Sequence, residues 1–155
     1  DFFWHDFTDN YLEIVKKRVY QGKGDKKLSA QYTLYKTLLT LIKLFAPITP
    51  FITEEIYQNH FKKFEKEKSI HLSSWPKPEE TEQKKLDKLH FFNLLVEVVT
   101  KIRQEKSRAK KSMNTEIILT LSRDKHTALK DFLGDLKDVM NIKEIKQGNF
   151  RVEFI

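Results

Sequence analysis

Acidic residues, histidines and glycines are present in this chain, but their spacing does not fit a reaction centre. No two of the five histidines are spaced at i and i+4, and the chain has no cysteine, so we expect no zinc site. Glu54 and Glu55 are adjacent and would point about 100° apart on a helix, so they cannot face each other as a catalytic pair. Gly22 and Gly24 lack the third glycine and the preceding strand of a phosphate-binding loop. We therefore expect no catalytic residue, metal or cofactor within these 155 residues.

Lysine and arginine are the remaining candidates for function, and they act through charge. The chain has 29 of them against 22 Asp and Glu, which gives a formal net charge of +7. Residues 16–27 hold five lysines and one arginine against one aspartate, and residues 101–111 hold six positive charges against Glu105 alone. Such runs favour a polyanionic partner because they neutralise phosphates. A solvated surface, or cations that offset a helix dipole, remain open as alternatives.

The composition sets limits on the class of protein. Hydrophobic residues make up 39% of the chain and aromatic residues 12%, which is enough to build a core for a domain of this length. No apolar run reaches 18 residues, so we expect no membrane-spanning helix. The first residue is Asp1 rather than methionine, and we expect the chain to be part of a longer protein.

Residues 29–58 are predicted to form two helices joined at a proline-containing turn. Apolar residues recur on two faces of the first helix, which therefore needs neighbours on two sides and should lie centrally in a bundle. Pro47 should end this helix, and Thr49 and Pro50 should begin the next. Four residues of the first helix are expected to be buried: Tyr35, Leu38, Leu39 and Ile42.

Two further helices complete the predicted bundle. One runs from the start of the chain to near Tyr20, and the other from Glu79 to Lys111. The apolar stripe of the second consists of Leu86, Leu89, Phe92, Val96, Val99 and Ile102. Beyond Ile102 the stripe ends, so this basic helix end should project or carry an interaction surface.

The spacing changes from helical to alternating at Thr115. Residues 115–121 alternate as in a strand with one buried face, and residues 129–136 then show the spacing of an amphipathic helix. Residues 142–146 and 150–155 flank Gln147-Gly148-Asn149, which predicts a hairpin. The expected fold is thus mainly α: an antiparallel helix bundle over residues 1–112, followed by a small mixed α/β unit of β-α-β-β order over residues 113–155.

One segment carries a family resemblance. Ala46-Pro47-Ile48-Thr49-Pro50-Phe51-Ile52-Thr53-Glu54-Glu55-Ile56-Tyr57 resembles a segment of the anticodon-binding domains of class I aminoacyl-tRNA synthetases for valine, isoleucine and leucine. Trp4-His5-Asp6-Phe7 and Asp9-Asn10-Tyr11-Leu12-Glu13 resemble the helix that precedes it.

The resemblance extends past that segment and covers roughly the first two thirds of the chain. Ser69-Ile70-His71-Leu72 with Trp75-Pro76 is similar to the part that follows it in the family, and Trp75 is expected to pack over the bundle rather than to stack on a base. The pairing of Tyr11-Leu12-Glu13 with Gln31-Tyr32-Thr33-Leu34-Tyr35 is most similar to the valine enzymes.

The resemblance implies the anticodon-binding part of a cytoplasmic valine–tRNA ligase, with valine tRNA and the remaining synthetase domains as partners. It also implies that further bundle helices and a nucleotide-binding fold, where ATP and magnesium would bind, lie elsewhere in the parent enzyme. The His-x-Gly-His and Lys-Met-Ser-Lys-Ser type motifs of that fold are absent here. Lys110-Lys111-Ser112-Met113 has similar letters in the wrong order, so the chain by itself is expected to be inactive.

Seven side chains are candidates for contact with tRNA, because they are basic or, in one case, polar at the end of the matching segment. They are Lys16, Arg18, Gln58, Lys62, Arg103, Lys106 and Arg108. Two alternatives remain open: the equivalent domain of an isoleucine enzyme, and a protein-interaction module derived from a synthetase appendage.

Overall fold

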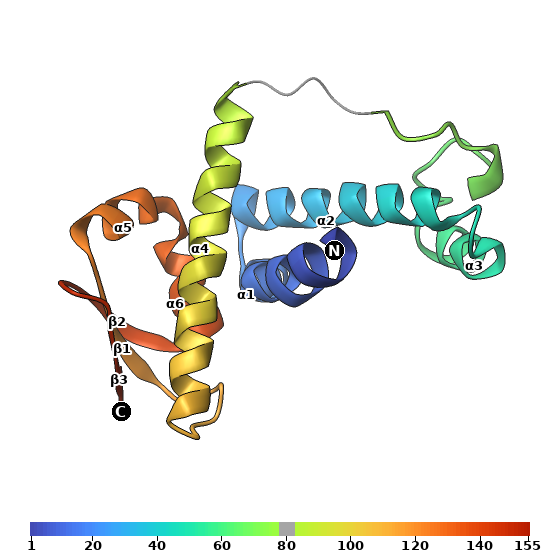
Figure 1. Cartoon of the computed structure of the whole chain (residues 1–155). Coiled ribbons are helices and arrows are strands. Elements are labelled where there is room, and N and C mark those ends of the chain that lie inside the picture. The colour runs from blue at the N-terminus through green and yellow to red at the C-terminus, as the bar shows by residue number, and fades with distance from the viewer. Residues whose placement is uncertain (78–82) are drawn as a thin grey trace. The chain divides into compact units, whose positions relative to one another are not determined.

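The chain forms two compact units (Figure 1). A computed structural model describes residues 1–77 and 83–155, so the expected helix start at Glu79 lies outside the described residues. One unit combines Asp1–Tyr20 with Thr81–Ile155, and the other is Gln21–Glu80. This grouping differs from the predicted division at residues 112 and 113, because a helix of the C-terminal part, Leu133–Met140, packs with the long helix that precedes it in the chain.

The unit Gln21–Glu80 consists of two helices and a short helical turn. Helix α2 spans Gly24–Phe45, α3 spans Pro50–His60, and a 3-10 turn (η2) spans Ile70–Leu72. The break between α2 and α3 contains Pro47, and α3 begins with Thr49 as its N-cap and Pro50 in its first turn. The proline spacing therefore predicted this turn correctly.

The core of this unit follows one stripe of α2. Leu39 and Ile42 are buried, as predicted, in a cluster with Ala46, Tyr57, Phe61 and Ile70. Tyr35 is only partly buried against this cluster. The prediction for Leu38 was wrong, because it lies about 100° around the helix from Leu39 and its side chain is 38% exposed.

The other unit begins with a continuous helical segment. A π-helix (η1) spans Phe2–Leu12 and continues into α1, Glu13–Gln21. Phe7 is buried, and its ring stacks on that of Tyr11 at 6.1 Å between centroids. Tyr11 in turn contacts Phe92 at 6.3 Å, which joins η1 to the long helix α4, Gln83–Arg108.

Helix α4 buries a stripe that agrees with the predicted one at Val99 and Ile102 but differs from it elsewhere. Leu95, Val98, Val99 and Ile102 are fully buried. Leu89 is 54% exposed, and the other predicted positions Phe92 and Val96 are only partly buried, whereas the side chain of Leu86 lies outside the described residues. The buried stripe is therefore shifted around the helix, and a helix of the C-terminal part, Leu133–Met140, packs against α4.

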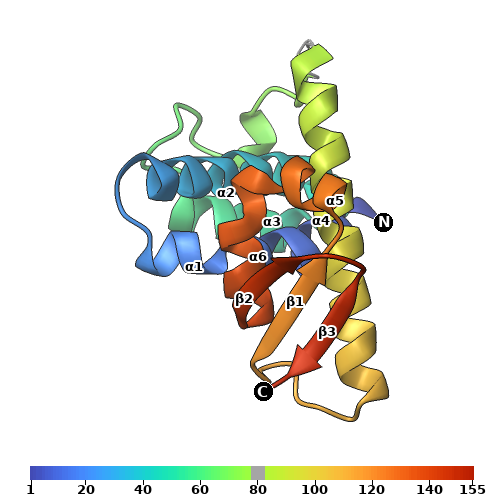
Figure 2. The ribbon, with the colours of Figure 1, turned by 90° about the vertical axis from the view of Figure 1, so that its left-hand side faces the viewer.

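Three strands and two helices follow α4. Strand β1 spans Ile117–Leu121, α5 Arg123–Ala128, a 3-10 turn (η3) Lys130–Phe132, α6 Leu133–Met140, β2 Ile142–Gln147 and β3 Arg151–Phe154. The strand order is β2-β1-β3, with β1 parallel to β2 and antiparallel to β3. Figure 2 shows β1 in the centre of the sheet and α4 and α6 behind it. The chain is thus mainly helical with a small α/β part, as predicted.

The predicted hairpin at Gln147-Gly148-Asn149 was wrong. Within the described strands, β2 and β3 do not pair with each other, because both pair with β1. The connection instead passes the end of β1, where the Gly148 amide donates to the Leu121 carbonyl at 2.8 Å. A Cβ at Gly148 would lie 3.0 Å from Cγ2 of Thr120, so the glycine allows this close crossing.

The two faces of the sheet differ in polarity. Ile117, Leu119 and Leu121 of β1 are fully buried, and Leu119 pairs with Val152 of β3 on the same face. The opposite face holds exposed ion pairs, such as that between Arg151 and Glu153. Among the helices of the described residues, none is long and apolar enough to cross a membrane.

Candidate nucleic-acid interface

The basic side chains of α1 point to solvent or to acidic partners on α6. Lys16 is exposed and pairs with Glu13 at 3.2 Å, and Lys17 is exposed and pairs with Asp138 at 2.5 Å. Arg18 instead binds Asp135 through two guanidinium nitrogens, and Asp135 is only 5% exposed. This bidentate pair holds α1 against α6, so Arg18 positions the helix and the lysines remain accessible.

The end of α4 presents a second group of cations. Arg108 is exposed and pairs with Glu105 at 2.8 Å, and Lys110 and Lys111 are exposed beyond it. Arg103 is partly buried and donates to the Asn10 side chain at 3.4 Å. Exposed pairs of this kind contribute little to stability, so a phosphate can replace the carboxylate partner.

Lys106 is not part of this surface, and its prediction as a tRNA contact was wrong. The side chain is fully buried. Its ammonium donates to the carbonyl oxygens of Met113 at 2.7 Å, Thr115 at 2.8 Å and Met140 at 2.8 Å. Burial lowers the pKa of Lys106, whereas the three carbonyl oxygens favour its charged form. The group joins the end of α4 to the start of β1 and the end of α6.

The sequence does contain a signal for this burial. Lys106 lies four residues after Ile102, which itself follows Val98 and Val99 at helical spacing. Lys106 therefore continues the buried stripe of α4 rather than its solvent face. Charge type suggested a surface residue, and position in the stripe would have corrected that interpretation.

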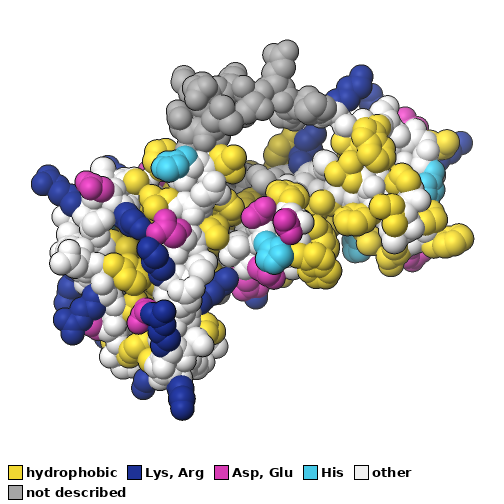
Figure 3. All heavy atoms as spheres, in the orientation of Figure 1, with side chains coloured by type: hydrophobic (Ala, Val, Ile, Leu, Met, Phe, Trp, Pro, Cys, Tyr) yellow, Lys and Arg dark blue, Asp and Glu magenta, His cyan; other side chains and the backbone are white. Residues whose placement is uncertain are grey.

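The two candidates in the other unit, Gln58 and Lys62, differ in whether their side chains are already hydrogen-bonded. Gln58 donates to Glu54 at 2.6 Å and to the Lys68 carbonyl at 2.7 Å, so its amide is already engaged. Lys62 is exposed just after α3. Figure 3 shows a largely hydrophobic surface over α3, where Phe51 is 90% and Ile48 75% exposed.

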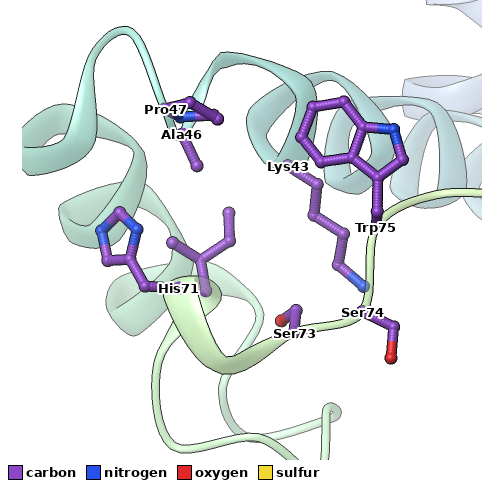
Figure 4. Close-up of a pocket in the computed structure, with 8 residues that line it drawn as sticks. Lys43, Ala46, Pro47, His71, Ser73, Ser74 and Trp75 are labelled. Atoms are coloured by element: carbon purple, nitrogen blue, oxygen red, sulfur yellow. The ribbon is translucent and has the colours of Figure 1, made fainter.

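A hollow of about 140 Å³ lies beside the end of α2 (Figure 4). Lys43, Pro47, His71 and Trp75 are among its lining residues. Trp75 is 59% exposed, so it does not act as the expected packing plug. The lining residues include no carboxylate, and among the described residues no group of three or more His, Cys, Asp or Glu could hold a metal ion. The lining residues of this hollow therefore offer no pair of an acid and a base.

Comparison with known proteins identifies the family. The model of the anticodon-binding domain of tRNA ligases matches residues 1–121. The chain belongs to this family. The matched anticodon-binding domain includes both basic helix ends and extends into β1.

Relatives of this domain occur in two kinds of ligase. The chain is 37% identical over 150 residues to valine–tRNA ligase of Methanothermobacter thermautotrophicus, covering 93% of this chain and 16% of that protein. Valine–tRNA ligase of Thermococcus kodakarensis is 34% identical over 148 residues, with 94% of this chain and 16% of that protein covered. Isoleucine–tRNA ligase of Pyrococcus furiosus is 34% identical over 157 residues, covering 99% and 15%. The chain thus spans about one sixth of the length of these relatives.

Proposed function

We propose that this chain is the tRNA-binding portion of a cytoplasmic valine–tRNA ligase and holds the anticodon arm. The observation that carries the proposal is the family match over residues 1–121. The similarity to valine–tRNA ligases over more than nine tenths of the chain supports it. The remaining domains of the parent ligase would bind ATP, magnesium and valine.

The binding surface in this proposal consists of the accessible cations at two helix ends. Lys16 and Lys17 of α1 contact phosphates, and Arg108, Lys110 and Lys111 form the second group. These side chains are exposed, and Lys and Arg are the usual ligands of RNA phosphates. Further candidates for contact with tRNA, outside these two groups, are Arg103, Lys62 and Gln58. Arg18 contributes by positioning α1.

An isoleucine–tRNA ligase is the second candidate parent, because isoleucine enzymes match with the same 34% identity as one of the valine enzymes. The discriminating experiment is ATP–pyrophosphate exchange by the full-length protein with each amino acid. We expect exchange with valine at lower concentrations than with isoleucine. The opposite order would assign the chain to the isoleucine enzymes.

The test of tRNA binding is a salt titration of fluorescence anisotropy with labelled valine tRNA. If about four phosphates are neutralised, log affinity falls with log salt at a slope of roughly −3. Lys16→Gln/Lys17→Gln and Lys110→Gln/Lys111→Gln should each weaken binding and flatten the slope.

A matched control neutralises two exposed lysines outside both groups, Lys130→Gln/Lys143→Gln. This control should bind as the wild type does. If both test variants also match the wild type at every salt concentration, neither helix end is the RNA surface. A stoichiometric protein partner that binds without RNA would then favour the protein-interaction alternative.

A further inference from the structure

The end of α1 combines an exposed aromatic ring with two lysines. Tyr20 is 76% exposed, and its side chain makes no ring contact or hydrogen bond with another described residue. Lys16 and Lys17 precede it by four and three residues, so the three side chains share one face of the helix. An open ring beside two cations is the combination that proteins use to bind single-stranded RNA.

No other exposed aromatic residue in the described helices has this arrangement. Phe51 is 90% exposed, but residues three and four positions after it are Glu54 and Glu55, which repel phosphates. Tyr32 is 64% exposed and has only Lys36 at such spacing. Sequence position and exposure together therefore single out Tyr20.

The contacts of α1 fix the position of the helix face that carries Lys16, Lys17 and Tyr20, and they leave these side chains accessible. Arg18 lies between the lysines and Tyr20 in sequence and is anchored to the buried Asp135 by two hydrogen bonds. The side chains of Lys16 and Lys17 are 59% and 54% exposed, and their partners Glu13 and Asp138 are themselves 48% and 33% exposed. Pairs this exposed to solvent are readily exchanged for a phosphate.

We propose that Tyr20 stacks on an unpaired base of the bound RNA, while Lys16 and Lys17 contact the phosphates that flank this base. The inference rests on the proposed function and adds a contact that the charge pattern alone does not provide. Stacking needs an unpaired base with a free face, whereas phosphate contacts form on paired and unpaired RNA alike. The contact would thus direct this surface to a loop rather than to a stem.

The experiment compares two RNA probes on the 155-residue chain: single-stranded oligoadenylate and an RNA duplex of the same length. Tyr20→Ala should weaken binding of oligoadenylate by roughly 5- to 150-fold, the usual effect of removing one stacked base. The slope of log affinity against log salt should stay unchanged, because no phosphate contact is lost. Duplex binding should also stay unchanged, and Tyr20→Phe should bind oligoadenylate as the wild type does.

The control variant is Phe51→Ala, which removes another exposed ring and should leave binding of both probes unaltered. A strand containing 5-bromouridine, crosslinked by light and mapped by mass spectrometry, should attach to Tyr20. If the wild type binds single-stranded RNA but Tyr20→Ala binds it equally well, the stacking site is refuted and the proposed function stands. Equal losses on both probes would also refute it. If the wild type binds no RNA at low salt, the proposed function fails and the stacking site fails with it.

Discussion

Lys106 is a charged residue that is fully buried at the end of α4 and has a structural role. Its ammonium donates to three carbonyl oxygens, two from the loop between α4 and β1 (Met113 and Thr115) and one from the last residue of α6 (Met140). An ammonium has three donors, and each has a partner here. The charge is therefore satisfied without a carboxylate, and the three segments share one hydrogen-bonding centre.

Lys106→Met tests this structural role. The substitution keeps most of the side-chain volume but leaves three carbonyl oxygens without their donor. We expect it to lower the free energy of unfolding by about 3–5 kcal/mol, as for the loss of one member of a buried charged contact. Urea unfolding followed by circular dichroism measures the change.

Lys101→Met is the matched control, because Lys101 is exposed on the same helix and pairs only with Glu97 among the described residues. Its effect should stay within about 0.5 kcal/mol. Equal midpoints for the two variants would show that the Lys106 ammonium contributes nothing to stability.

At the scale of residues, burial follows from the sequence where the position of a residue on the helix and its side-chain chemistry agree. Leu39 and Ile42 are apolar and lie on the right stripe, and both are buried. Lys106 was misassigned because its charge outweighed its place four residues after Ile102. Asp135 and Asp138 could not be identified as partners of α1 from the sequence. Asp135 lies 117 residues after its partner Arg18, and Asp138 lies 121 residues after its partner Lys17.

At the scale of elements, local spacing predicted the strands but not their order. The alternation from Ile117 to Leu121 matches the alternating burial of β1. The two-residue period says nothing about which strand is central, and a glycine between two strands is typical of a hairpin. Here β1 is the central strand because it pairs with both β2 and β3, and Gly148 allows the close crossing between them past the end of β1.

Glu54 links α3 to the segment that follows it, and the link depends on pH. One carboxylate oxygen accepts from the Ser69 hydroxyl at 2.9 Å and from the Ile70 amide at 3.0 Å. Burial raises the pKa of Glu54, but hydrogen bonds from Gln58, Ser69 and Ile70 outweigh burial, and the pKa is lowered overall. We expect Glu54→Gln to lower the free energy of unfolding by about 1–2 kcal/mol at pH 7.

The pH dependence of this link follows from the direction of the shift. A lowered pKa in the folded state adds stability above the unfolded value of about 4.3, and this contribution disappears as the pH falls through the folded pKa. The difference in urea midpoint between wild type and Glu54→Gln should therefore shrink as the pH falls below about 4. Glu55→Gln, which removes the charge of an exposed acceptor for Asn59 but keeps an acceptor oxygen, should show almost no difference from the wild type at pH 7 or below pH 4. A gap between wild type and Glu54→Gln that stays constant with pH would contradict the assignment.

At the scale of the whole molecule, the chain is an anticodon-binding domain of the tRNA ligase family with two groups of accessible cations. The accessible cations lie at the ends of α1 and α4, and the described residues present no cluster of metal-ligating side chains. The family resemblance in the sequence predicted the anticodon-binding domain correctly, because it depended on a local segment around Pro47 and Pro50. How the two units divide the chain could not be predicted in this way, since the first unit joins segments separated by sixty residues of the second.

The chain by itself should not catalyse valine-dependent ATP–pyrophosphate exchange. Activation of an amino acid requires groups that hold the triphosphate in line with the attacking carboxylate, and the sequence contains neither of the two nucleotide-binding motif types of class I synthetases. The chain also spans only 16% of a valine–tRNA ligase such as that of Thermococcus kodakarensis. The measurement is incorporation of labelled pyrophosphate into ATP, with that full-length ligase as the positive control. Exchange that follows the purified chain through successive columns, and that requires valine, would place a catalytic site within these residues. The same preparation should still bind tRNA in the salt titration, because phosphate contacts at the helix ends need no nucleotide-binding fold.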